Sequence, residues 1–308
     1  MGVLAKILPL VFLMALGFAL QRLHFFEEVS FKRFQSFMMR VTIPCLLFTA
    51  FANMEFGRGQ LIVSAGMFLF MLIMLMLGAL FYRVLPIKHD FFIFFFSAFG
   101  FGTVGFPVFV EIFGMENATP MALLGMGHEI FIAGVLIPAV HVYYSKGGVK
   151  FNAFFSSTMI MVALGAVIGI GNFFPMIAGN IVGAGLLETI SRVGGMTLPI
   201  ALILTGYRLK LSDRRYLKIS AIYAAVRLVV AISVGVPFKL LFFDTLAPSF
   251  PLLDHAFYTF ILQHGPIVLL VYIGQHRPIE EQIIANNAFV LHMAAGVALL
   301  FVYMLAFL

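Results

Sequence analysis

The sequence predicts an all-helical protein that crosses a membrane about ten times. Of its 308 residues, 62% are hydrophobic and only 10% are charged, whereas a soluble domain is about half apolar and a quarter charged. A spanning helix needs roughly 20 apolar residues, and about ten such stretches cover most of the chain. Because lipid cannot satisfy backbone polar groups and these stretches are too long for barrel strands, we expect α-helices.

The predicted spans follow one another with short connections that leave no room for a separate soluble domain. They comprise residues 3–21, 34–52, 61–82, 91–113, 120–143, 153–171, 190–208, 216–242, 257–275 and 282–306. The first stretch also has features of a signal peptide, but it is long and no small-residue cleavage site closes it, so we interpret it as a span. The single cysteine, Cys45, excludes an internal disulfide and a cysteine-based metal site.

Lysine and arginine residues gather on one side of the predicted membrane. The loops after odd-numbered spans carry thirteen of the nineteen, the opposite side carries four, and Arg40 and Arg227 lie inside spans. Because basic loops stay in the cytoplasm, both termini are expected on the extracytoplasmic side. The expected location is the cell membrane, with a bacterial inner membrane as the simplest case.

Three pairs of short motifs recur in the same order in the two halves of the chain. They are Ala15-Leu16-Gly17 with Ala163-Leu164-Gly165, Ile43-Pro44 with Leu198-Pro199, and Gly105-Phe106-Pro107 with His264-Gly265-Pro266, at offsets of 148, 155 and 159. Each half holds five spans, an odd number, so the second copy must lie inverted in the membrane. We therefore expect two inverted five-helix repeats, residues 1–145 and 146–308.

Spans 4 and 9 carry the glycines and prolines that are expected to break them, since proline cannot donate a helix hydrogen bond and clashes with the preceding turn. Inverted repeats with such breaks are typical of secondary transporters, and paired half-helix N-termini favour an anion. The predicted substrate-binding residues are Gly102, Thr103, Gly105 and Pro107 in span 4, and Gln263, His264, Gly265 and Pro266 in span 9. The alternative is that these prolines only kink packed helices.

Motifs in spans 2, 4, 7 and 9 carry a family resemblance. They are Ile43-Pro44-Cys45-Leu46-Leu47-Phe48, Gly102-x-x-Gly105-Phe106-Pro107 before Phe113-Gly114, Leu198-Pro199-Ile200-Ala201-Leu202 with Gly206, and Pro266. Over nearly its whole length the chain resembles the auxin efflux carrier family of plant PIN carriers and bacterial organic-acid permeases. The resemblance implies a fold similar to that of bile-acid/sodium symporters. In that fold, helices 1, 2, 6 and 7 form a scaffold, and helices 3–5 and 8–10 form a moving domain in which helices 4 and 9 cross.

The chain departs from this family at one position of span 4. The family often has an asparagine seven residues before the proline, where this chain has Gly100. An amide that would hold substrate or ion is therefore missing. The long central loop of the plant carriers is also absent, because only residues 144–152 join spans 5 and 6. The resemblance is thus closer to the bacterial permeases.

Titratable residues inside the spans are few and costly to insert, so each is a functional candidate. Glu129 in span 5, beside His128, is the predicted proton carrier; the alternative is a static hydrogen bond or ion pair, for instance with Arg227. Glu111 is expected either to face a helix N-terminus or to reach water, and a structural role for His264 is as acceptable as a ligand contact. Protons are the preferred coupling ion and sodium is the second choice.

Other functional classes have weaker support in the sequence. Residues 100–105 match the dinucleotide fingerprint G-x-G-x-x-G, but that motif requires a strand before it and a helix after it. His128-Glu129 begins like the metalloprotease motif H-E-x-x-H, but residue 132 is isoleucine, so the second ligand is missing. No nucleic-acid partner, cofactor or metal is expected. If the protein were an enzyme, the alternative would be an intramembrane hydrolase.

The sequence therefore predicts a secondary active transporter of small organic anions, with carboxylates favoured, and not an enzyme. We expect a permease or efflux carrier that works by elevator-type alternating access and is coupled to protons. The alternatives are a sodium-coupled organic-anion symporter and a non-transporting membrane receptor or sensor for the same ligand. Substrate identity, transport direction and oligomeric state, a homodimer included, stay open.

Overall fold

The structure is a computed structural model, and it describes residues 3–54, 57–84, 89–145, 157–209, 211–247 and 250–307. In the first half the α-helices are α1 (Val3–Arg22), α2 (Glu28–Phe37), α3 (Ile43–Ala52), α4 (Arg58–Val84), α5 (Phe91–Phe95), α6 (Phe106–Phe113), α7 (Thr119–Phe131) and α8 (Ile137–Ser145). In the second half they are α9 (Ser157–Ile170), α10 (Phe174–Ala178), α11 (Ile181–Gly195), α12 (Thr197–Arg208), α13 (Leu217–Phe238), α14 (Asp244–Leu246), α15 (Leu253–Ile261), α16 (Ile267–His276) and α17 (Ile279–Phe307). The described residues contain no strand, as an all-helical fold requires.

Short π-helical segments join several of these helices into longer ones. They are Met38–Thr42, Phe101–Gly105, Ile132–Leu136 and Lys239–Phe243. Each inserts a wider turn into the helix, a feature that is frequent at functional sites. Through the first of them, α2 and α3 form one apolar helix over Val29–Ala52.

Six helices in the described part of the chain are long and apolar enough to cross a membrane. They are Val29–Ala52, Gly59–Val84, Thr119–Tyr144, Ile181–Arg208, Arg214–Leu246 and Ile279–Phe307. The other predicted spans fall on the shorter apolar helices Leu8–Arg22 and Ser157–Ile170 and on the two interrupted pairs α5–α6 and α15–α16. A multi-pass helical membrane protein is confirmed, while ten crossings and the inverted repeat stay predictions.

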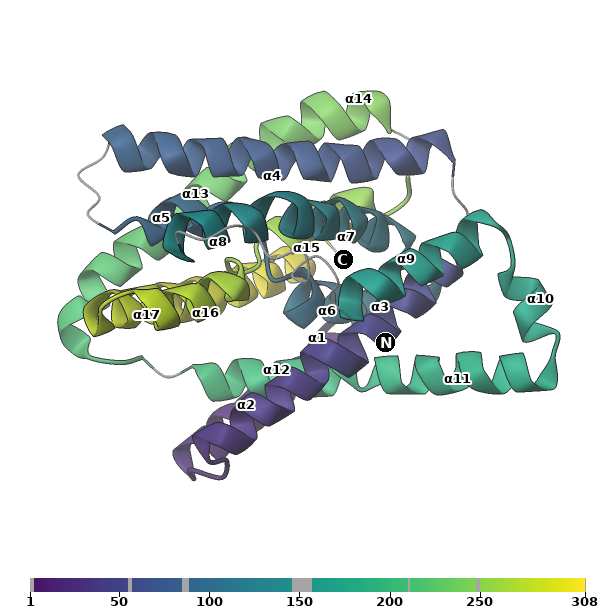
Figure 1. Ribbon diagram of the computed structural model, residues 1–308, viewed down its shortest axis with the longest axis horizontal. Helices are drawn as coiled ribbons and strands as arrows, with labels where there is room; N and C mark the ends of the chain where they lie inside the picture. Colours follow the sequence, from purple (N-terminus) through teal and green to yellow (C-terminus); the bar gives the residue numbers. More distant parts are fainter. Residues whose placement is uncertain are drawn as a thin grey trace.

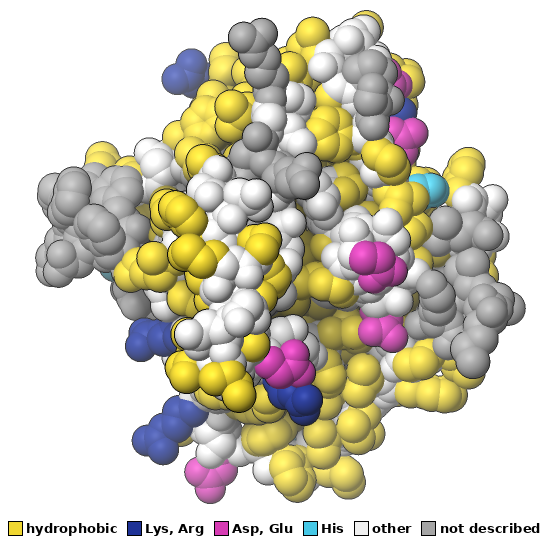
Figure 2. All heavy atoms as spheres, turned by 90° about the vertical axis from the view of Figure 1, so that its right-hand side faces the viewer, with side chains coloured by type: hydrophobic (Ala, Val, Ile, Leu, Met, Phe, Trp, Pro, Cys, Tyr) yellow, Lys and Arg dark blue, Asp and Glu magenta, His cyan; other side chains and the backbone are white. Residues whose placement is uncertain are grey.

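The outer surface is apolar, as lipid contact demands. Large hydrophobic side chains stand far out of the protein, for example Ile181, which is 91% exposed, and Met76, which is 71% exposed. Figure 2 shows one face covered mainly by hydrophobic side chains, with a few charged groups scattered over it. In water such a continuous apolar surface would drive association, so it indicates a lipid environment.

The helices pack as two groups that contain residues from both halves of the chain. Helix α1 packs along α12, and α3 packs against α9 and α11; separately, α4 packs on α7, and α13 on α17 (Figure 1). The α1–α12 contact is close because Gly17 faces the backbone at Ile203 and Gly206 faces the backbone at Met14. Small residues allow such backbone approach between membrane helices.

Two helices are interrupted by irregular segments of the same length. The first segment comprises residues 96–100, between α5 and the π-helical turn that leads into α6, and the second comprises residues 262–266, between α15 and α16. We call them the first and second break. The first break lies before Gly102–Pro107, the residues of span 4 that were expected to interrupt the helix and bind substrate. Pro107 instead lies in the first turn of α6. A proline is tolerated at a helix start, where its missing N–H is not needed.

Candidate functional site

The two breaks lie directly against each other. A Cβ atom added at Gly100 would lie 2.4 Å from Cε1 and Nε2 of His264, and one added at Gly265 would lie 3.0 Å from the Phe95 ring. A Cβ atom added at Gly105 would lie 3.3 Å from Cγ of Gln263. Glycine therefore eases the crossing at three points. A side chain at position 100 would collide with the His264 ring, and one at position 105 or 265 would require its neighbours to shift by a few tenths of an ångström.

Arg227 of α13 links both breaks from within the protein. Its guanidinium donates from Nε to the Phe95 carbonyl at 2.7 Å, from Nη2 to the Ala98 carbonyl at 2.9 Å and from Nη1 to the Gln263 carbonyl at 2.9 Å. Nη1 also lies 2.7 Å from Nε2 of His292 in α17. The side chain is fully buried. The alternative ion pair between Arg227 and Glu129 is not formed in the structure, since these carbonyls and His292 take its donors.

His128 and Glu129 connect α7 to the first break. His128 is buried, its Nε2 lies 2.8 Å from the Phe99 carbonyl, and its Nδ1 lies 3.2 Å from Oε1 of the partly buried Glu129. The shorter contact favours donation from Nε2–H to the carbonyl over acceptance from the Phe99 N–H at 3.4 Å. Glu129 is thus connected through His128 to the backbone of the first break.

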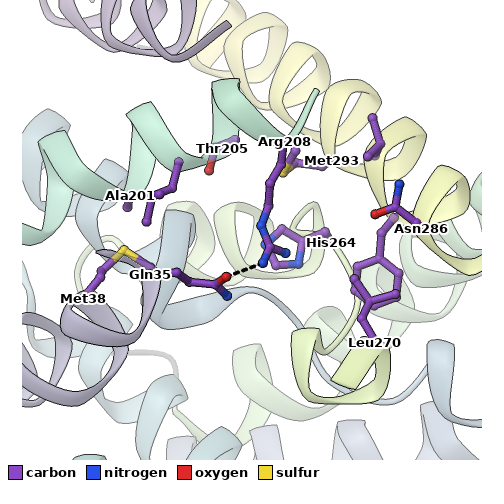
Figure 3. A pocket seen from close by; sticks show the side chains of 12 residues that line it. Gln35, Met38, Ala201, Thr205, Arg208, His264, Leu270, Asn286 and Met293 are labelled. Atoms are coloured by element: carbon purple, nitrogen blue, oxygen red, sulfur yellow. Dashed lines mark hydrogen bonds between the residues drawn. The ribbon is translucent and has the colours of Figure 1, made fainter. Parts of the chain in front are cut away.

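A small, largely apolar pocket that also contains several polar side chains lies between the two helix groups (Figure 3). Its lining comes from α2 and the adjoining π-helical turn, α12, the second break, α16 and α17: Gln35, Met38, Ala201, Leu204, Thr205, Arg208, His264, Leu270, Asn286, Phe289, Val290 and Met293. Nη2 of Arg208 donates to Oε1 of Gln35. The volume of about 40 Å³ holds about three water molecules.

Arg208 brings a positively charged side chain to this pocket. It is partly buried at the end of α12, and the partner that it contacts, Gln35, is an uncharged amide. Guanidinium binds carboxylates with two parallel hydrogen bonds, and charge-assisted bonds are about twice as strong as neutral ones. Apolar side chains, among them Met38, Leu270 and Met293, line the rest of the pocket.

The predicted binding residues are distributed unevenly around this pocket. His264 lines it, while Gln263, Gly265 and Pro266 are buried beside it in the second break. Gly105 and Pro107 are buried after the first break, and a Cβ atom at Gly102 would meet the side chain of Ile43 in α3 at 3.2 Å. The side chain of Thr103 lies outside the described residues. Glu111 is exposed in α6.

The imidazole of His264 occupies the space that a side chain at position 100 would need. It is buried and its Nδ1 lies 2.7 Å from the carbonyl oxygen of Gly265. With glycine at position 100, the ring can lie across the first break. A polar side chain from the second break thus lies beside position 100, where the family that the chain resembles often has an asparagine.

Sequence reasoning missed the pocket residues Gln35, Arg208 and Asn286. Arg208 ends a span, so it was counted with the basic loop residues that set the orientation. Gln35 lies in α2, before the apolar part of the span, where a polar residue gives no indication of a binding site. Only the packing of α2 against the end of α12 brings these groups together, and no local pattern predicts that contact.

Comparison with known proteins supports a transport role. A family model described as a membrane transport protein matches residues 2–147, which comprise α1 to α8. A search of curated proteins finds no match. The family match covers the first break and the His128–Glu129 pair, whereas Arg208, Arg227 and the second break lie outside it.

Proposed function

The chain is a membrane transport protein, related to the auxin efflux carrier family through residues 2–147, and we propose that it is a secondary active transporter of small organic anions. The observation that carries this proposal is the pocket between the helix groups, with Arg208 on one wall and His264 of the second break on the other. Carboxylates are the favoured substrates, because the Arg208 guanidinium can bind them in a bidentate manner.

The pocket supports an elevator-type mechanism because its walls belong to different helix groups. Gln35 lies on α2 and Arg208 on α12, which belong to the predicted scaffold, and His264 and Asn286 come from the predicted moving group. When the moving group slides, the half of the site contributed by the second break moves with the substrate. Separation of the two walls also supplies the volume that the closed pocket lacks.

The N-terminus of α16 supplies a second favourable contact for a bound carboxylate. Residues His264 and Leu270, on either side of the first turn of α16, both line the pocket. The first N–H groups of a helix lack partners within the helix, and the dipole favours negative charge there. A carboxylate bound between Arg208 and this turn would be attracted by both helix groups and released when they part.

Coupling to protons is supported by the His128–Glu129 pair. It contacts the Phe99 carbonyl in the first break, so a change in its protonation alters a hydrogen bond to the moving backbone. Sodium coupling is the alternative. Ion replacement at constant pH separates them, because proton coupling predicts accumulation driven by a pH gradient in sodium-free medium.

The deciding experiment is flux of labelled carboxylates into proteoliposomes that contain the purified protein. A transporter accumulates substrate when a pH gradient is imposed and loses it when the gradient is collapsed. A receptor or sensor binds the same compounds, as seen by a ligand-induced rise in Tm, but shows no flux above empty liposomes. That second outcome would reject the proposed function.

A further inference from the structure

Arg227 carries a buried positive charge that no carboxylate neutralises within the described residues. The ion pairs that the described residues form involve other basic groups, such as Lys239 with Asp254 and Arg277 with Asp90. An isolated charge in a dry interior is very costly. Other groups must therefore stabilise the guanidinium, and its contacts identify them as backbone carbonyls.

These carbonyls lie at or within three residues of the C-terminal ends of the interrupted helices α5 and α15. Phe95 is the last residue of α5, Ala98 lies in the first break, and Gln263 lies in the second break. Carbonyls at a helix C-terminus lack intrahelical partners and together carry the negative end of the helix dipole, at most about half a charge per helix end. Two such ends face one guanidinium, so the positive charge and the two partial negative charges offset each other.

Aromatic faces and a histidine complete the surroundings of the guanidinium. Its central carbon lies 4.7 Å from the centre of the Phe99 ring and 5.3 Å from that of Phe95, distances at which rings attract a cation. Nε2 of His292 must accept the Nη1–H bond, so this nitrogen carries no proton. Each hydrogen-bond partner of Arg227 among the described residues is thus an acceptor, an arrangement that suits a cation.

We propose that Arg227 is a covalently tethered cation that occupies the carbonyl-lined centre of the crossing and replaces a sodium ion there. In transporters with broken helices, unwound carbonyls and half-helix C-termini are the groups that coordinate such ions. Here the same kind of group is already engaged at 2.7–2.9 Å by the guanidinium. A sodium ion beside it would lack these oxygen ligands and would be repelled by a like charge.

This inference deepens the proposed function, on which its transport consequence rests: the carrier works without sodium. Its structural consequence is independent of transport. Removing the guanidinium leaves an oxygen-lined cavity between the breaks, and that cavity should bind a small free cation. The protein should then acquire a dependence on dissolved cations that the unaltered chain does not have.

The test compares the Tm of purified wild type and Arg227→Ala in chlorides of sodium, guanidinium at millimolar concentration, or N-methylglucamine, at equal ionic strength and pH. The wild type is expected to show the same Tm in all three. Arg227→Ala should melt lower in N-methylglucamine, and guanidinium or sodium should restore its Tm saturably, by about 5–10 °C when the site is filled. N-Methylglucamine is too large to enter the cavity.

Arg192→Ala is the matched control, because Arg192 is exposed and pairs with Glu188 on α11; its Tm should respond to no cation specifically. Arg227→Lys keeps a tethered charge but not the forked donors, so it should melt lower than wild type and stay insensitive to sodium. If Arg227→Ala does not fold, the wild type and Arg227→Lys decide by their response to sodium.

Two results would overturn the inference: a wild-type Tm or wild-type uptake that requires sodium, or a folded Arg227→Ala that no small cation stabilises. Failure of the proposed function would look different. In that case no carboxylate flux is seen in any medium, while the cation pattern of the melting temperatures is unchanged.

Discussion

Replacing Arg208 by glutamine should weaken the binding of a carboxylate substrate more than any other single change in the pocket. The substitution removes the positive charge and the forked donor while keeping an amide that can still meet Gln35. The net contribution of a hydrogen bond to a charged group is about 1.5–3 kcal/mol, which corresponds to about a 10- to 150-fold rise in Kd. Arg208→Lys should fall between the two, because it retains the charge without the fork.

The assay is calorimetric titration of the best carboxylate found in a Tm screen, performed on detergent-purified wild type and variants. Arg192→Gln is the matched control: the same change at an exposed arginine whose side chain is 79% accessible. Exposed ion pairs contribute about 0–1 kcal/mol, and this one is remote from the pocket lining, so substrate affinity should not change. The reasoning is refuted if folded Arg208→Gln, with a wild-type Tm, binds the carboxylate with wild-type affinity.

Three further predictions test coupling, the crossing and topology. Glu129→Gln should abolish uptake driven by a pH gradient and leave carboxylate exchange measurable; an unchanged pH dependence of uptake would reject the proton role. Gly265→Val should abolish substrate binding in correctly trafficked protein, because even a Cβ atom there lies 3.0 Å from the Phe95 ring; wild-type affinity would show that the crossing tolerates bulk. In a variant with Cys45 replaced by alanine, a cysteine introduced at the exposed residue Leu246 should be labelled only from outside. A cysteine at residue 213 should be labelled only from the cytoplasm. Labelling of both from the same side would contradict the ten-span topology.

The interruptions in the helices were predictable from sequence, and their positions only in part. Gly265 and Pro266 lie inside the second break, as the pattern indicates. In the first half the chain returns to helix at Phe101. Pro107 follows a π-helical turn, and the helix continues through it. Proline marks a position where the backbone lacks an N–H for helix hydrogen bonding. Such a position can be the start of a helix or an interruption within one. The sequence alone cannot distinguish these two cases.

The role of Arg227 could be noticed from sequence but not assigned. A charged residue inside an apolar span is a functional candidate, and the obvious search is for a carboxylate partner such as Glu129. The structure gives it carbonyl partners instead. Every residue has a carbonyl, so such partners leave no trace in composition or spacing. Only the exposure of carbonyls at two broken helix ends makes them available.

Arg227 and Arg208, the two arginines near the crossing, have different electrostatic surroundings. Arg227 is fully buried, and its donors are directed to the carbonyls of both breaks and to His292, so binding a substrate there would require breaking the crossing itself. Arg208 lines a pocket and holds a neutral amide, Gln35. A carboxylate that displaces this amide replaces a neutral acceptor by a charged one, which strengthens the bond. The charge of Arg227 therefore maintains the geometry of the crossing, while in the function that we propose Arg208 can exchange Gln35 for substrate.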